Sequence, residues 1–107
     1  MMQVSLQTLQ LLQVFMEDPS QPRYGLELAK RTGLKSGTVY PALGRLERDG
    51  YVRSKWESHA VAQREKRPPR RYYEITAAGS RALATSVEHY RTLGERLGLV
   101  TRKPSAG

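Results

Sequence analysis

Apolar side chains near the start of the chain recur at the spacing of an amphipathic helix. Leu9, Leu12 and Phe15 follow one another at three-residue steps between polar positions, which places them on one face of a helix. Ser5 is a suitable N-cap, because its hydroxyl can accept a hydrogen bond from a free backbone N–H. The pattern predicts a first helix over residues 5–17, ending before the prolines that follow.

A second, shorter helix is predicted over residues 24–33. Leu26 and Ala29 are three positions apart and are expected to face inward. Gly33 is expected to end the helix, because glycine adopts the left-handed conformation of a helix C-cap without steric cost.

A third helix is predicted over residues 36–49. Ser36 is its expected N-cap, and Val39, Leu43 and Leu46 are spaced to face the core. A small residue in one helix, a glycine turn and apolar residues in the next are what a helix-turn-helix requires, with the second helix presented to the major groove of DNA. An ordinary helical hairpin has the same spacing, so this motif alone leaves both interpretations open.

After residue 50 the helical periodicity gives way to alternation. Residues 51–57 alternate between two faces, and residues 71–76 are rich in aromatic and β-branched side chains, so both segments are predicted to be strands of a β-ribbon. Residues 58–69 between them are polar and end in prolines, and a loop is expected there.

The last helix is predicted over residues 77–99, with Thr76 as its N-cap. Its apolar stripe consists of Leu83, Val87, Tyr90 and Leu97. This stripe could pair two chains or cover the chain's own core, and a core this small benefits from a partner. Residues 100–107 are expected to form a flexible tail.

These elements predict a mainly α fold with a small β-ribbon, of the α+β class. Residues 1–76 form the predicted helix-turn-helix domain, and we refer to its ribbon with the connecting loop as the wing. Residues 77–99 form the predicted dimerisation helix.

Basic residues concentrate in the central half of the chain. The 107 residues carry 18 Lys and Arg against 10 Asp and Glu, a net charge of +8. Residues 23–71 hold thirteen of the basic and five of the acidic residues, so the whole excess lies there. Such a localised positive field suits a polyanion. A charge run alone can also be a solvated loop, but this one surrounds a helix-turn-helix.

The candidate DNA-binding residues lie on the outward face of the third helix and in the wing. The small residues near the helix N-terminus would let the backbone approach phosphate, while Arg45 could contact either guanine or phosphate. On the helix these residues are Ser36, Gly37, Thr38, Tyr40, Pro41 and Arg45; in the wing they are Arg64, Lys66, Arg67, Arg70 and Arg71.

Four stretches resemble the PadR family of bacterial transcriptional regulators. They are Tyr-Gly-Leu-Glu-Leu at 24–28, Gly-Thr-Val-Tyr-Pro-Ala-Leu-Gly-Arg-Leu-Glu at 37–47, Gly-Tyr-Val at 50–52 and Arg-Arg-Tyr-Tyr-Glu-Ile-Thr-Ala-Ala-Gly at 70–79. The resemblance implies a winged helix-turn-helix that binds a partly palindromic operator as a homodimer, usually as a repressor. It also implies dimerisation through the last helix, and DNA contacts from 36–45 and 57–71.

The sequence departs from the family pattern in two places. The wing loop is longer and more basic than the Gly-Pro-Arg tip of the family, so its grip on DNA is expected to be mainly electrostatic. The C-terminal region is a single helix, as in the short members. Some members bind flat aromatic ligands between subunits, but the only tryptophan here is Trp56, in a strand, so no effector is assigned.

Several function classes are disfavoured by composition. The chain has no cysteine and only two histidines, His59 and His89, neither in a metal or nucleophile motif. No glycine-rich phosphate loop is present, so neither an enzyme nor a cofactor nor a metal site is expected. No apolar run reaches the length of a membrane span and no signal segment begins the chain, so a cytoplasmic protein is expected.

Two other binding functions remain as alternatives. The same fold could serve as a protein-interaction module without specific DNA binding, although such modules often lack a basic wing. RNA is less favoured than duplex DNA, because the A-form major groove does not admit a helix and no exposed aromatic platform is evident from the sequence.

Overall fold

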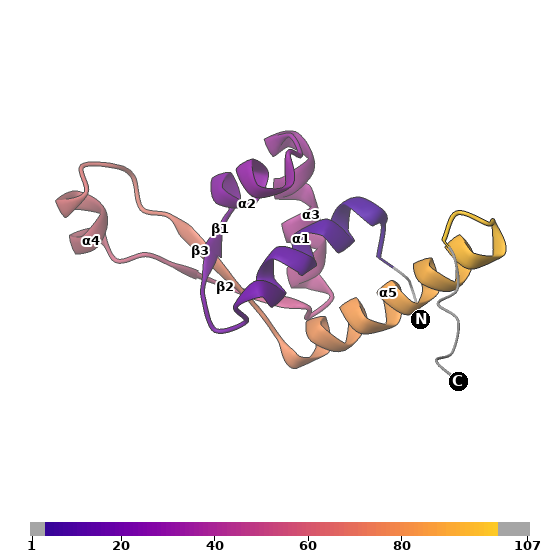
Figure 1. The fold of residues 1–107 in the computed structure, drawn as a ribbon. Coiled ribbons are helices and arrows are strands. Elements are labelled where there is room, and N and C mark those ends of the chain that lie inside the picture. Colours follow the sequence, from indigo (N-terminus) through magenta and orange to yellow (C-terminus); the bar gives the residue numbers. More distant parts are fainter. Residues whose placement is uncertain (1–3, 101–107) are drawn as a thin grey trace.

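The computed structural model describes residues 4–100, which form five helices and three strands (Figure 1). The fold is mainly α with a small antiparallel sheet, and its class is as predicted. In chain order the elements are α1 (Leu6–Glu17), β1 (Arg23–Tyr24), α2 (Gly25–Thr32), α3 (Ser36–Arg48), β2 (Val52–Trp56), α4 (His59–Arg64), β3 (Arg71–Ile75) and α5 (Ala77–Arg96). Within residues 4–100, no helix combines the length and apolarity needed to cross a bilayer.

The sheet has three antiparallel strands in the order β1-β3-β2. Val52 is paired with Ile75 and Trp56 with Arg71 along the predicted ribbon. The added edge strand, β1, pairs Arg23 with Tyr73. It is only two residues long, too short for alternation to reveal it, so the predicted two-stranded ribbon was incomplete.

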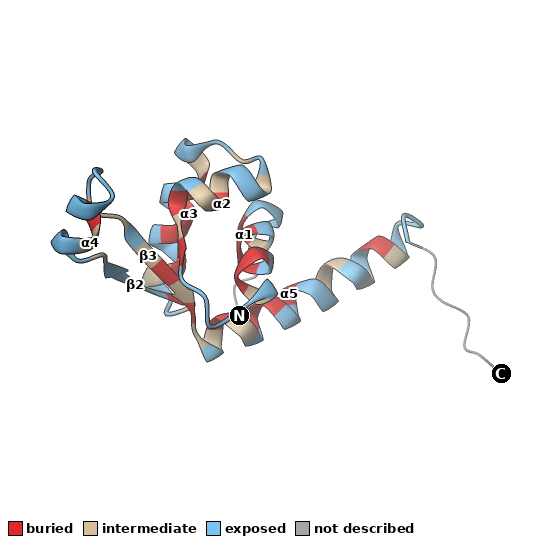
Figure 2. Cartoon of the chain, turned by 60° about the vertical axis from the view of Figure 1, so that its left-hand side comes forward, coloured by how far each residue is buried: buried red, intermediate tan, exposed pale blue. Residues whose placement is uncertain are grey.

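The core lies between α1, α2, α3 and the sheet (Figure 2). Leu12 and Phe15 of α1 are buried as predicted. In α2, Ala29 packs partly buried against the core as predicted, but Leu26 is 56% exposed and Leu28 is fully buried in its place. Successive residues of a helix are separated by about 100°. Leu26 and Leu28 therefore point to opposite sides, and the core takes the stripe that begins with Gly25 and Leu28.

Of the three predicted helix N-caps, two are present and the third is displaced by one residue. The hydroxyl of Ser5 accepts from Thr8 N at 3.2 Å, and that of Thr76 accepts from Gly79 N at 3.1 Å. Ser36, in contrast, is the first residue of α3, and Lys35 is the N-cap. The carbonyl of Lys35 already accepts from Thr38 N at 2.9 Å, which places the helix start one residue earlier than predicted.

The wing contains a short helix, α4, in the segment that was predicted to be a loop. The hydroxyl of Ser58 accepts from Val61 N at 3.2 Å and caps α4, and Ala62 is buried beneath it. Arg67 N then donates to the carbonyl of Ala62 at 3.1 Å, after Lys66 has turned the chain with φ 54°. The six residues of α4 are too few to show a helical period, and the serine cap is the one local signal of this helix in the sequence.

The final helix leaves the body of the protein along part of its length (Figures 1 and 2). Leu83 in its first half belongs to the core, whereas Val87 and Leu97 are exposed. The helix ends at Arg96, before the predicted 99, and Gly98 turns the chain with φ 73° so that Leu99 N donates to the carbonyl of Gly94 at 2.8 Å. The predicted tail from 101 onward lies outside the described residues.

Candidate nucleic-acid interface

The helix-turn-helix places α3 with one face inward and one face free. Gly33 adopts φ 76°, and its N–H donates to the carbonyl of Ala29 at 2.9 Å, closing α2 before α3 begins. The inward side chains of α3 are Val39, Ala42, Leu43 and Leu46, each at most 2% exposed. The opposite face of α3 is therefore the one that faces solvent.

A ridge of small residues runs along the centre of this outer face. At about 100° per residue, Gly37, Pro41 and Gly44 fall opposite the buried stripe, and all three are exposed. A Cβ atom added at Gly37 or Gly44 would meet nothing within 4 Å. With little side chain on the ridge, the α3 backbone itself can come close to the floor of a groove.

Tyr40 flanks the ridge on the side of the wing. Its ring lies against the start of α2, where a Cβ on Gly25 would be 2.4 Å from the Tyr40 ring. The side chain is nevertheless 48% exposed. Gly25 therefore acts as a positioning residue, because the Tyr40 ring occupies the space that a side chain at position 25 would fill.

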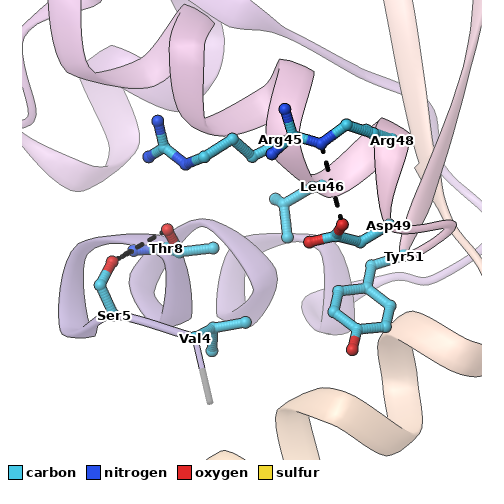
Figure 3. Close-up of a pocket in the computed structure, with 8 residues that line it drawn as sticks. All are labelled: Val4, Ser5, Thr8, Arg45, Leu46, Arg48, Asp49 and Tyr51. Carbon is cyan, nitrogen blue, oxygen red and sulfur yellow. Dashed lines mark hydrogen bonds and ion pairs between the residues drawn. The ribbon is translucent and has the colours of Figure 1, made fainter. Parts of the chain in front are cut away.

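Arg45 flanks the ridge on the side of α1, together with Thr38. Arg45 and Arg48 line a hollow of about 400 Å³ between the C-terminal half of α3 and the N-terminus of α1, with Ser5, Thr8 and Tyr51 (Figure 3). Arg48 lies 4.0 Å from Asp49, while the Arg45 guanidinium has no hydrogen-bond or ion-pair partner within the described range. Its charge is therefore not neutralised by any residue that the structure describes.

The wing is organised by the carboxylate of Glu57. This side chain is only 8% exposed. It accepts two hydrogen bonds from the guanidinium of Arg67, at 2.5 and 3.0 Å, and one from Arg70 N at 3.4 Å. The Arg67 guanidinium lowers the pKa of Glu57, and Glu57 raises the pKa of Arg67. The pair therefore stays ionised at a pH where a free glutamate begins to protonate.

A second ion pair ties the wing to α3. Arg71 donates to Glu47 at 3.0 Å and to the hydroxyl of Ser54 at 3.0 Å, and Ser54 in turn donates to Glu47 at 2.5 Å. These contacts cross from β3 through β2 to the helix. They fix the angle between the two elements that were predicted to touch DNA.

The predicted cationic residues therefore divide into two groups. Arg67 and Arg71 are ion-paired within the chain, and the Arg70 guanidinium lies 4.0 Å from the centre of the Tyr24 ring. Arg64 and Lys66, at the end of α4, are exposed and form no ion pair in the part of the chain that the structure describes. The basic residues of the first group make contacts that hold the wing in its conformation, whereas those of the second group are not paired with any described residue.

One exposed aromatic residue was missed as a site residue. Trp56, at the end of β2, is 62% exposed, although the alternation placed it on the same face as Val52, which is buried. The ribbon extends past the body at this point (Figure 1), so the inward face of the strand no longer meets a core. Together with Tyr40, it contradicts the expectation that no exposed aromatic surface is present.

Comparisons with known proteins agree with this geometry. Residues 11–85 match the family described as "Transcriptional regulator PadR-like family". No protein of curated function matches the sequence.

Solved structures of transcriptional regulators share the fold. A PadR family transcription regulator from Clostridium difficile superposes with a TM-score of 0.72 at 23% identity, covering 88% of this chain and 96% of the other. A PadR family regulator from Eggerthella lenta gives 0.66 at 28% identity, with 87% and 82% covered. A transcriptional regulator from Clostridium thermocellum gives 0.70 at 23% identity, with 90% of each chain covered.

Proposed function

Because the chain belongs to the PadR-like family of transcriptional regulators, we propose that it represses transcription by binding a partly palindromic operator as a homodimer. In this proposal α3 enters the major groove and the wing, residues 57–71, contacts the backbone and the neighbouring minor groove. The two-fold axis of the dimer places the half-sites about one helical turn apart, or a multiple of that spacing.

The observation that carries this proposal is the open outer face of α3. Within residues 4–100 no other element covers the ridge of Gly37, Pro41 and Gly44, and cations without an ion-pair partner in that range lie on both sides of it, Arg45 on the helix and Arg64 in the wing. A helix that only completes a core does not require small residues and unpaired arginines on its outer face, whereas a helix that enters a DNA groove does. The family consists of transcription regulators, not enzymes.

Sequence specificity is tested by selecting duplexes from a random pool with the full chain and titrating the selected duplex by gel shift. Arg45→Ala is expected to reduce discrimination by about 1–3 kcal/mol if Arg45 contacts a base edge. Arg96→Ala, which removes an exposed arginine from α5, is the matched control and should leave the preference unchanged. Equal affinity of the wild type for selected and random duplexes would overturn the proposal.

Dimerisation is supported by the distal part of α5. Val87 is 44%, Leu93 40% and Leu97 62% exposed, a concentration of apolar surface that a second copy would bury. Of the other two residues predicted for this role, Leu83 lies in the chain's own core and Tyr90 donates its hydroxyl to the carbonyl of Val4 at 2.8 Å. Sedimentation equilibrium at micromolar concentration should give the mass of two chains; a mass of one chain would remove the dimer from the proposal.

A further inference from the structure

A hollow lies in the corner between α2, α3 and the base of the wing. It measures about 410 Å³. Its walls include Tyr24 from β1, Leu26 from the start of α2, Tyr40 from α3, and Trp56, Pro68 and Arg70 from the wing. We refer to these six residues as the aromatic pocket. Nothing in the family assignment gives this pocket a role.

The pocket exposes an unusual amount of apolar surface. Trp56 is 62%, Leu26 56% and Tyr40 48% exposed. The other exposed large apolar side chains of residues 4–100 are Leu6 at the start of α1 and a group on and after α5. Large apolar side chains gathered in one hollow mark a binding surface, and this one is separate from the surface proposed for dimerisation.

The charged side chains that line the pocket are arginines. Arg67 and Arg71 are paired with Glu57 and Glu47, and Arg70 has no ion-pair partner within residues 4–100. Arg70 stacks over Tyr24 at 4.0 Å, and the Arg71 guanidinium lies 5.7 Å from the centre of the Trp56 ring. Arg67 also borders the hollow, and no carboxylate is among the residues that line it. The occupant that fits is therefore a molecule with an apolar segment next to negative charge.

We propose that the aromatic pocket binds the sugar-phosphate backbone of one DNA strand, with a deoxyribose against Trp56 and Tyr40 and an adjoining phosphate facing Arg70. This inference rests on the proposed function: if α3 lies in the major groove and the wing reaches the minor groove, the strand that separates the grooves passes over this corner. A paired strand turns its bases inward and presents sugars and phosphates outward, which is the alternation of apolar and anionic groups that the pocket matches.

The single tryptophan makes the pocket directly observable. Trp56 is the only tryptophan of the 107 residues, so its emission reports this site alone. The full chain is titrated at low salt with a duplex of arbitrary sequence, because a backbone contact needs no operator. Trp56 emission should change with the same midpoint as the anisotropy of a labelled duplex, and bound DNA should shield Trp56 from acrylamide.

Three variants separate apolar packing from charge. Trp56→Ala should weaken binding to all duplexes by roughly tenfold, as expected for the loss of a buried aromatic contact, and leave the salt dependence unchanged. Trp56→Phe should retain most of the affinity. Arg70→Ala should instead reduce the slope of affinity against salt by about one. Thermal melting should show all three variants folded, since Trp56 is largely exposed.

The outcomes distinguish this inference from the proposed function. If duplex binds tightly while Trp56 emission and acrylamide access stay constant, the pocket does not meet DNA and the inference fails, although the function stands. If single-stranded DNA binds more tightly than duplex and quenches Trp56 more, the occupant is an unpaired base and the inference also fails. If arbitrary duplex binds and protects Trp56 but no sequence is preferred, the inference stands while the specific function fails.

Discussion

Replacing Gly79 by alanine is expected to lower the free energy of unfolding by at least about 3 kcal/mol, the upper range for forcing an extra carbon into a packed site. A Cβ at this position would lie 2.1 Å from the carbonyl oxygen of Tyr51 and 2.8 Å from Cγ1 of Ile75. The Tyr51 carbonyl cannot move freely, because it accepts a hydrogen bond from Thr76 N at 3.0 Å. The whole first turn of α5 must therefore shift away from the sheet.

Urea denaturation followed by circular dichroism measures this loss, with Gly44→Ala as the matched control. Gly44 also lies inside a helix, but its Cβ position is open, so the alanine should stabilise the chain by about 0.5–1 kcal/mol through the lower entropy of its unfolded state. Equal stability of the two variants would contradict the packing described for the start of α5.

Replacing Glu57 by glutamine is expected to weaken DNA binding by about tenfold, even though it raises the net charge by one. Removing an acidic residue from a DNA-binding surface ordinarily strengthens binding, since it lowers repulsion of the phosphates. Here the neutral amide loses the charge-assisted bonds from Arg67, which releases the wing from its fixed conformation. The entropy of reordering the wing on DNA then opposes binding.

Fluorescence anisotropy with a fixed duplex measures the effect, and Glu65→Gln is the control. Glu65 follows α4 in the same wing, is exposed, and has no ion-pair partner within residues 4–100. Its replacement should raise affinity slightly. An increase in affinity for both variants would show that Glu57 acts only as a negative charge and does not organise the wing.

Much of this fold follows from short-range patterns. The three-residue steps of α1, the caps at Ser5 and Thr76 and the positive φ of Gly33 are local features, so the residues that determine them are adjacent in the sequence. The buried stripe of α3 likewise needed only its own periodicity. Two of the failures depended on distant partners: β1 exists because β3 lies beside it, and Leu28 is buried instead of Leu26 because the core lies on that side. The missed helix α4, in contrast, had a local signal in the cap of Ser58.

The position of the candidate interface in the chain could be predicted from the sequence, but the role of each basic residue in it could not. The sequence located the positive charge around α3 and the wing, yet it could not show that Glu57 neutralises Arg67 across ten positions or that Glu47 meets Arg71 across 24. Trp56 was overlooked for a related reason. Its face of the strand is inward near Val52, and only the three-dimensional structure shows where the body ends.

The most direct test of the interface is side-chain labelling by hydroxyl radicals, read by mass spectrometry, with and without a saturating selected duplex. Tyr40 on the recognition face and Leu97 at the end of α5 are both exposed in the free chain, at 48% and 62%. The duplex should strongly reduce labelling of Tyr40 and leave Leu97 unchanged. Unchanged labelling of Tyr40 in a saturated complex would show that DNA binds elsewhere and that α3 is not the recognition helix.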